Sequence, residues 1–231
     1  MGDLLPKGHH LRTIVFDLDG TLADTAGDLI AAANAALVQL GHAPQLVMGS
    51  DDATAFAGGR AMLRLAAERL GIADAEGLAD TGYQPLLDAY GAEIDTHTTL
   101  YPGTLAAIDR LRAQGHATGI CTNKPEGLAV TLIARLGLTD RFPVLIGADT
   151  LPTRKPDPAP LAETIARLGG ASDRAVLIGD TITDRKTAAA LGVPCVLVTF
   201  GPNGRAVAEL EPEALLDHYD ELDAVLDRLL P

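Results

Sequence analysis

Short apolar runs alternate with segments of helical periodicity along most of the chain. Apolar runs bounded by polar or glycine-containing segments predict buried strands, and apolar residues recurring every three or four positions predict helices. The pattern predicts strands over 12–17, 117–122, 144–147, 175–179, 195–199 and 214–216. It predicts helices over 24–41, 60–70, 78–94, 104–114, 125–136, 160–168, 183–191 and 220–230.

The strands and helices follow one another differently in two regions. Residues 25–98 contain helical patterns only, the last of them interrupted near Gly82 and Pro85. The later chain alternates strand and helix, which is typical of a parallel sheet with helices on both faces. We therefore predict an α/β core formed by residues 1–24 and 99–231, with residues 25–98 inserted as a helical domain.

The composition is that of a soluble globular protein. The chain has 231 residues, of which 47% are hydrophobic and 21% are charged, enough for one domain with an insert. No apolar run approaches the roughly 20 residues that cross a bilayer, and residues 1–12 lack a signal-peptide pattern. These features predict a cytoplasmic protein without a membrane partner. Cys121 and Cys195 lie in apolar runs and are predicted to be reduced core thiols.

The formal net charge of −13 argues against nucleic acid as a partner, because phosphate-backbone binding needs a basic face. It leaves a small anion possible, since a local lysine, backbone N–H groups and a divalent cation can hold phosphate in an acidic protein. Only four lysines are present, at positions 7, 124, 155 and 186.

Candidate chemistry begins at the first strand, in the octet Ile-Val-Phe-Asp-Leu-Asp-Gly-Thr at residues 14–21. Asp17 and Asp19 follow the apolar run, at the sheet edge where open α/β folds bind ligands. Two such close carboxylates repel each other unless a cation or a shared proton intervenes. Because turns also favour Asp and Gly, the octet alone fits either a reaction centre or an ordinary turn.

Three later strands also end in polar residues. The polar groups are Thr122-Asn123-Lys124, then Lys155 within Arg-Lys-Pro-Asp-Pro, then Asp180 with Asp184 four residues on. In a parallel sheet all of these ends face the same way, so carboxylates, a hydroxyl and an ammonium would share one cleft.

Phosphoryl transfer suits this set of groups. One carboxylate can act as nucleophile, and a second can protonate the leaving alcohol and then activate water. Mg²⁺ prefers oxygen ligands such as Asp17 and Asp180. Lys155 would neutralise the nucleophile and phosphoryl oxygens, while Thr122 Oγ and turn N–H groups would cradle those oxygens. We include Gly20 of the turn among the predicted substrate-binding residues.

The order of these motifs resembles the haloacid dehalogenase-like hydrolase superfamily from Arg12 to about Gly201. The four motifs are Asp-Leu-Asp-Gly-Thr, Thr-Asn-Lys, Lys-Pro-Asp-Pro and Gly-Asp-Thr-Ile-Thr-Asp. Within the superfamily the chain is most similar to the phosphoglycolate phosphatase family. The stretches that carry this similarity are 100–103, 122–125, 155–158 and 188–199 with Gly201.

The resemblance implies a Rossmann-like sheet, a helical cap over residues 25–98 and dependence on Mg²⁺. It implies Asp17 as nucleophile and Asp19 as general acid/base, with the Asp19 backbone carbonyl as a further metal ligand. It also implies that Thr122 binds phosphoryl oxygen and that Lys155 steadies the phosphorylated aspartate. Asp180 would be a metal ligand and Asp184 would support the metal's water shell.

The resemblance also separates subclasses. The dehalogenase branch lacks an acid at the place of Asp19, and phosphomutase relatives more often carry Val at the place of Thr21. The cap has no lysine, so it lacks the Schiff-base lysine of phosphonate-cleaving relatives. We therefore expect a phosphatase acting on a small phosphorylated metabolite, with 2-phosphoglycolate as the best single candidate.

Several alternatives stay open. The alternative functions are a sugar-phosphate mutase, a sugar, nucleotide or pyrophosphate phosphatase, a non-catalytic binding protein and a phosphoreceiver. The expected assembly is a monomer or a homodimer. Arg60, after two glycines, could pair with a substrate carboxylate or be a surface arginine. Asn123 and Lys124 could bind substrate or be loop residues, and Asp184 could cap the following helix. Tyr83 and Tyr90 are expected in the core of the cap.

Overall fold

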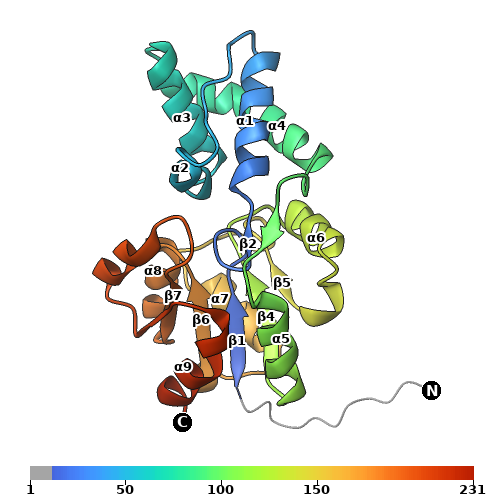
Figure 1. Ribbon diagram of the computed structural model, residues 1–231, viewed down its shortest axis with the longest axis vertical. Coiled ribbons are helices and arrows are strands. Elements are labelled where there is room, and N and C mark those ends of the chain that lie inside the picture. Colours follow the sequence, from blue (N-terminus) through green and yellow to red (C-terminus); the bar gives the residue numbers. More distant parts are fainter. Residues whose placement is uncertain (1–11) are drawn as a thin grey trace, which may run out of the picture.

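The computed structural model, which describes residues 12–231, contains a parallel sheet with a helical unit above one of its edges (Figure 1). The six strands lie in the order β5-β4-β1-β6-β7-β8, and every neighbouring pair is parallel. The strands are β1 (Thr13–Phe16), β4 (Ala117–Cys121), β5 (Leu145–Ile146), β6 (Ala175–Gly179), β7 (Cys195–Val198) and β8 (Ala214–Leu216). Residues 1–11 lie outside the described residues. The predicted fold class is confirmed.

Side-chain alternation along β1 divides the core into two layers. Ile14 and Phe16 belong to one buried cluster and Val15 to the other, because successive strand residues point to opposite faces. The first cluster includes residues of α5 (Thr104–Ala113), α6 (Glu126–Arg135) and α9 (Leu222–Leu229). The second includes residues of α7 (Ala159–Arg167) and α8 (Ile182–Leu191). Both faces of the sheet are therefore covered, and β1 is central.

Four helices form the unit above the sheet, which we call the cap. They are α1 (Ala26–Gln39), α2 (Asp52–Phe56), α3 (Gly59–Leu70) and α4 (Ala75–Ala92). The predicted interruption near Gly82 and Pro85 is wrong, because α4 is continuous through both. Gly82 lies against Leu63 of α3, where a Cβ would come 3.0 Å from a Leu63 methyl carbon. Close packing thus favours glycine here, and tertiary contacts outweigh the local helix-breaking preference.

The cap joins the core through β2 (Ala23–Asp24) and β3 (Thr99–Leu100), which pair antiparallel. Two residues are too few to give a strand pattern, so neither was predicted. The Asp28 carboxylate, at the start of α1, accepts hydrogen bonds of 2.8 Å from the backbone N–H groups of His97 and Thr98 and one of 2.7 Å from Thr98 Oγ1. These hydrogen bonds therefore hold the segment that enters the cap against the segment that leaves it. The domain boundaries at 24/25 and 98/99 remain predictions.

Four short 3₁₀ helices complete the described elements: Thr139–Arg141, Ser172–Arg174, Gly204–Leu210 and Tyr219–Glu221. Cys121 and Cys195 are buried free thiols, as predicted. No helix in the part of the chain that the structure describes has the length and hydrophobicity to cross a membrane.

Candidate active site

Asp17 follows β1 directly and lies at the carboxyl edge of the sheet. Its backbone N–H donates to the Ile178 carbonyl of β6 at 2.8 Å, which extends the ladder by one residue. Its side chain is buried, and Oδ1 accepts a 2.7 Å hydrogen bond from the backbone N–H of Leu18. The other oxygen, Oδ2, lies 3.0 Å from Lys155 Nζ. Asp17 is thus held with one oxygen in the turn and the other against a cation.

Lys155 is a buried ammonium between two carboxylates. Its Nζ lies 2.6 Å from Asp184 Oδ1 as well as near Asp17. Burial alone would lower the pKa of Lys155, but the attraction of Asp17 and Asp184 raises that pKa above its ordinary value, so the side chain stays charged. The Asn123 amide donates to the Lys155 carbonyl at 2.9 Å. Asn123, predicted to bind substrate, therefore steadies the loop that carries the lysine.

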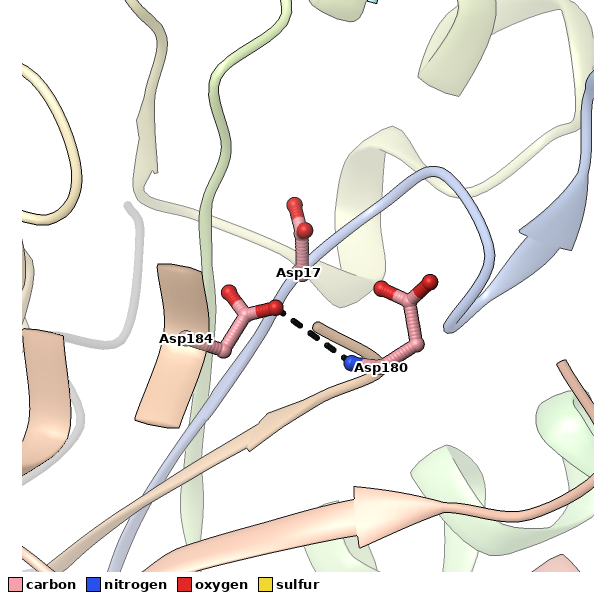
Figure 2. Close-up of side chains that lie close together, drawn as sticks. All are labelled: Asp17, Asp180 and Asp184. Atoms are coloured by element: carbon pink, nitrogen blue, oxygen red, sulfur yellow. Dashed lines mark hydrogen bonds between the residues drawn. The ribbon is translucent and has the colours of Figure 1, made fainter. Parts of the chain in front are cut away.

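Figure 2 shows Asp17, Asp180 and Asp184 converging from β1, β6 and α8. Each offers a carboxylate oxygen, and these atoms lie within 4.8 Å of one another. Burial raises the pKa of Asp17 to about 6 against the attraction of Lys155, and repulsion from Asp184 adds to that rise. Burial, followed by repulsion from Asp184 and Asp17, also raises the pKa of Asp180 well above its ordinary value. The cluster therefore carries more negative charge than the protein around it neutralises.

Both Asp184 oxygens already have donors. Oδ1 accepts from Lys155, while Oδ2 accepts from Thr181 Oγ1 at 2.8 Å, from the Thr181 backbone N–H at 3.1 Å and from the Asp180 backbone N–H at 3.3 Å. Asp184 and Thr181 form a capping box at the start of α8. These contacts support the helix-capping interpretation of Asp184 and make it a residue that positions Lys155.

Asp180 differs from its neighbours in having an unpartnered oxygen. Oδ1 accepts a weak 3.3 Å hydrogen bond from Thr21 Oγ1, but Oδ2 is buried without a hydrogen-bond partner among the described residues. A Cβ on Gly20 would come 2.3 Å from this oxygen, and Gly20 also has a positive φ of 76°. Only glycine satisfies both conditions. A carboxylate that has an orphaned oxygen and lies close to the Asp17 carboxylate fits a divalent cation with oxygen ligands.

The Asp19 side chain lies apart from this cluster and has its own cation. Its oxygens are 2.8 and 3.0 Å from Lys124 Nζ, and Oδ1 also accepts a 2.7 Å hydrogen bond from Thr25 Oγ1. Lys124 is buried, and its Nζ lies 4.3 Å from the ring centroid of Tyr90 on α4. Asp19 is thereby linked to the start of the cap through Thr25 and to a cap helix through Lys124.

Thr122 lies at the carboxyl end of β4, the neighbour of β1, and is buried. Its hydroxyl accepts a 3.2 Å hydrogen bond from the Lys124 backbone N–H. That bond leaves the hydroxyl hydrogen available as a donor to a substrate oxygen.

Arg60, in contrast, is engaged within the cap. Its guanidinium lies 2.6 Å from Asp80 and stacks over the ring of Tyr83, with 5.1 Å between Cζ and the ring centroid. The Arg60 side chain is 43% exposed, so these contacts support the surface-arginine interpretation.

Sequence reasoning missed three contributors. Thr21 was considered only as a subclass marker, yet its hydroxyl contacts Asp180. The Tyr219 hydroxyl donates to the Thr21 carbonyl at 2.9 Å from 198 residues along the chain, a contact that no local pattern reveals. Thr25 could have been noticed, because a threonine before a helical segment has a side chain suited to local hydrogen bonds.

Comparisons with known proteins agree with this architecture. The model of the haloacid dehalogenase-like hydrolase family matches residues 14–198, so the chain belongs to this family. A phosphoglycolate phosphatase of Mesorhizobium japonicum is 42% identical over 225 residues, which cover 94% of this chain and 96% of the relative. One from Cereibacter sphaeroides is 40% identical, with 94% and 98% covered.

A solved structure shares the fold at lower identity. The crystal structure of a HAD-superfamily hydrolase of subfamily IA from Geobacter sulfurreducens superposes with a TM-score of 0.70 at 19% identity. The match covers 96% of this chain and 99% of that structure. That structure therefore shares the overall fold of this chain.

Proposed function

We propose that the protein hydrolyses 2-phosphoglycolate, or a closely similar small phosphate monoester, through a phosphorylated Asp17. The protein is a phosphoric monoester hydrolase of the haloacid dehalogenase-like family, and its relatives at about 40% identity bear the name of this activity. The observation that carries the proposal is the pair of carboxylates on one turn, each against its own buried lysine. Asp17 has Lys155, and Asp19 has Lys124.

Asp17 is the nucleophile in this proposal. One of its oxygens attacks phosphorus, and the bond between phosphorus and the leaving oxygen breaks. Asp19 gives a proton to that oxygen as the alcohol departs. Asp19 then takes a proton from water, whose oxygen attacks phosphorus and breaks its bond to the Asp17 oxygen, so that inorganic phosphate leaves and both carboxyl groups return to their initial state. Thr122 and Lys155 bind the phosphoryl oxygens, since a hydroxyl and an ammonium both donate hydrogen bonds to them.

Asp17 and Asp180 would hold Mg²⁺, with the Asp19 backbone carbonyl as a third protein ligand. The orphaned Oδ2 of Asp180 is the observation that supports this assignment. When bound, the ion offsets the repulsion between the nucleophile and the phosphoryl group. Asp184 would hold Lys155 and would also support the water shell of the ion.

The cap, residues 25–98, would close over the substrate and limit access of bulk water. The burial of Lys124 beneath Tyr90 supports this role. We further propose a cytoplasmic enzyme, monomeric or homodimeric, whose partner is a small phosphorylated metabolite and not a nucleic acid.

The test is a phosphate-release screen with Mg²⁺ over 2-phosphoglycolate, sugar phosphates, nucleotides and pyrophosphate. We expect 2-phosphoglycolate to give the highest kcat/KM. Formation of an isomer from a sugar phosphate without phosphate release would favour the mutase alternative. Comparable rates across the panel would contradict a dedicated substrate.

A further inference from the structure

Two lysines in the site have different surroundings. Lys155 contacts Asp17, which receives the phosphoryl group, while Lys124 contacts Asp19, which serves the departing oxygen. Their side chains are 1% and 3% exposed. The site therefore has one buried cation for the phosphoryl end of a substrate and another beside the leaving-group end.

Lys124 keeps a donor for a further acceptor. An ammonium has three N–H donors, and the acceptors recorded for Nζ among the described residues are the two oxygens of Asp19. The Tyr90 ring, which is buried in the cap, also lies near the ammonium, with 4.3 Å between Nζ and the ring centroid. An aromatic face attracts a cation without accepting a full hydrogen bond.

The position of Lys124 fixes which substrate atoms it can reach. A substrate oxygen that hydrogen-bonds to the Lys124 side of Asp19 has its neighbouring atoms within reach of the ammonium, because Nζ is itself 2.8 Å from the Asp19 carboxylate. Attraction between opposite charges is stronger in such a buried place than in water. Arg60, the cap cation that the sequence suggested for a substrate carboxylate, is instead paired with Asp80 at 2.6 Å.

We infer that Lys124 is a specificity-determining residue that binds a carboxylate on the leaving alcohol, beside the oxygen served by Asp19. The substrate class is then the phosphate monoesters of short 2-hydroxy acids, in which a single carbon separates the ester oxygen from the carboxylate. This inference rests on the proposed function. It adds a physical reason for the enzyme to prefer a phosphate monoester with a carboxylate on the leaving alcohol over one without it.

The experiment compares two substrates of equal chain length, 2-phosphoglycolate and ethyl phosphate, which lacks the carboxylate. The measured quantity is the ratio of their kcat/KM values in the wild type, Lys124→Met, Lys124→Arg and Lys186→Met, all with Mg²⁺. Lys186 is an exposed lysine of α8 and is the matched control. A charge-assisted contact of this kind corresponds to a preference of about 10- to 100-fold.

We expect Lys124→Met to lower the ratio by about 10- to 100-fold, Lys124→Arg to keep most of it and Lys186→Met to leave it unchanged. If Lys124→Met lowers kcat/KM equally for both substrates, Lys124 serves Asp19 alone and the inference is overturned. If the wild type releases phosphate from neither compound, the proposed function itself fails.

If Lys124→Met hydrolyses neither substrate, a binding measurement tests the inference in place of kinetics. In an Asp17→Asn background, which prevents turnover, the two phosphates are compared as ligands by the rise in Tm, with and without Lys124→Met. The inference requires that Lys124→Met weaken binding of 2-phosphoglycolate more than binding of ethyl phosphate. Equal weakening, or none, overturns it.

Discussion

Asp180→Asn should make the protein insensitive to Mg²⁺ while leaving its fold intact. Among the described residues the three carboxylates of Figure 2 are paired with one ammonium, Lys155, so two negative charges remain uncompensated there. At the 4.8 Å limit that bounds the ligand atoms, two like charges repel by about 3.5 kcal/mol at an effective dielectric constant of about 20. Asn removes one charge and retains the shape of the side chain.

The expected magnitude follows from ligand linkage. Mg²⁺ at 100 times its Kd stabilises the folded state by about 2.7 kcal/mol. For a chain of this size 1 kcal/mol changes the Tm by about 2–4 °C, so the wild type should gain about 5–10 °C. Asp180→Asn should gain less than about 2 °C, because it loses the orphaned oxygen that we assign to the ion.

The direction of the Tm difference between Asp180→Asn and the wild type without Mg²⁺ can also be predicted. The pKa of Asp180 is raised by burial in the folded protein, so ionised Asp180 opposes folding once the pH exceeds its unfolded pKa, and this cost grows with pH up to the folded pKa. At neutral pH without Mg²⁺, Asp180→Asn should therefore have a higher Tm than the wild type.

Differential scanning fluorimetry with EDTA and then with a Mg²⁺ titration measures both effects. Asp140→Asn, an equal charge change at an exposed position, controls for net charge. A Mg²⁺-induced rise in Tm of the same size in Asp180→Asn and the wild type would refute the assignment of Asp180 as a ligand.

Three further predictions concern hydrogen bonds and the proton donor. Asp28→Ala should lower the free energy of unfolding by about 2–4 kcal/mol in urea titrations, because it leaves the backbone donors of residues 97 and 98 unpaired; a loss below about 1 kcal/mol would contradict this. Tyr219→Phe should lower the free energy of unfolding by about 1 kcal/mol, since it loses the hydrogen bond to Thr21. Tyr90→Phe should leave the free energy of unfolding unchanged, because the Tyr90 hydroxyl is buried without a partner among the described residues. Equal losses in the two variants would show that the Tyr219 hydrogen bond does not contribute to stability. Asp19→Asn should lower kcat/KM, which reports the steps up to phosphoryl transfer to Asp17, by about 10²–10⁴-fold for 2-phosphoglycolate and much less for p-nitrophenyl phosphate, since that leaving group departs without a proton; equal losses of kcat/KM on both substrates would argue against proton donation.

The sheet was predictable because its strands are buried on both faces and therefore appear as continuous apolar runs. The residues that end these strands were predictable for the same reason, since parallel strands bring their carboxyl ends to one edge. Asp17 and Asp180 follow β1 and β6 directly, and Lys155 meets them from the loop that follows β5. The β2–β3 pair was not predictable, because two-residue strands leave no periodic pattern.

The division of roles among the charged side chains was less accessible. Whether Asp184 binds a metal or caps a helix depends on which donors reach its two oxygens, and one of these is Lys155, 29 residues away. Arg60 and Lys124 were similar candidates in the sequence, yet one lies on the surface of the cap and the other is buried against Asp19. Such differences arise from tertiary packing, so only the folded chain resolves them.

The central claim, that Asp17 carries the phosphoryl group, is tested most directly by acid quenching during turnover of 2-phosphoglycolate with Mg²⁺, followed by mass spectrometry of the peptides. The account predicts a phosphoryl adduct on Asp17 in the wild type, and neither adduct nor turnover in Asp17→Asn. An adduct on a different residue, or sustained phosphate release by Asp17→Asn, would contradict it.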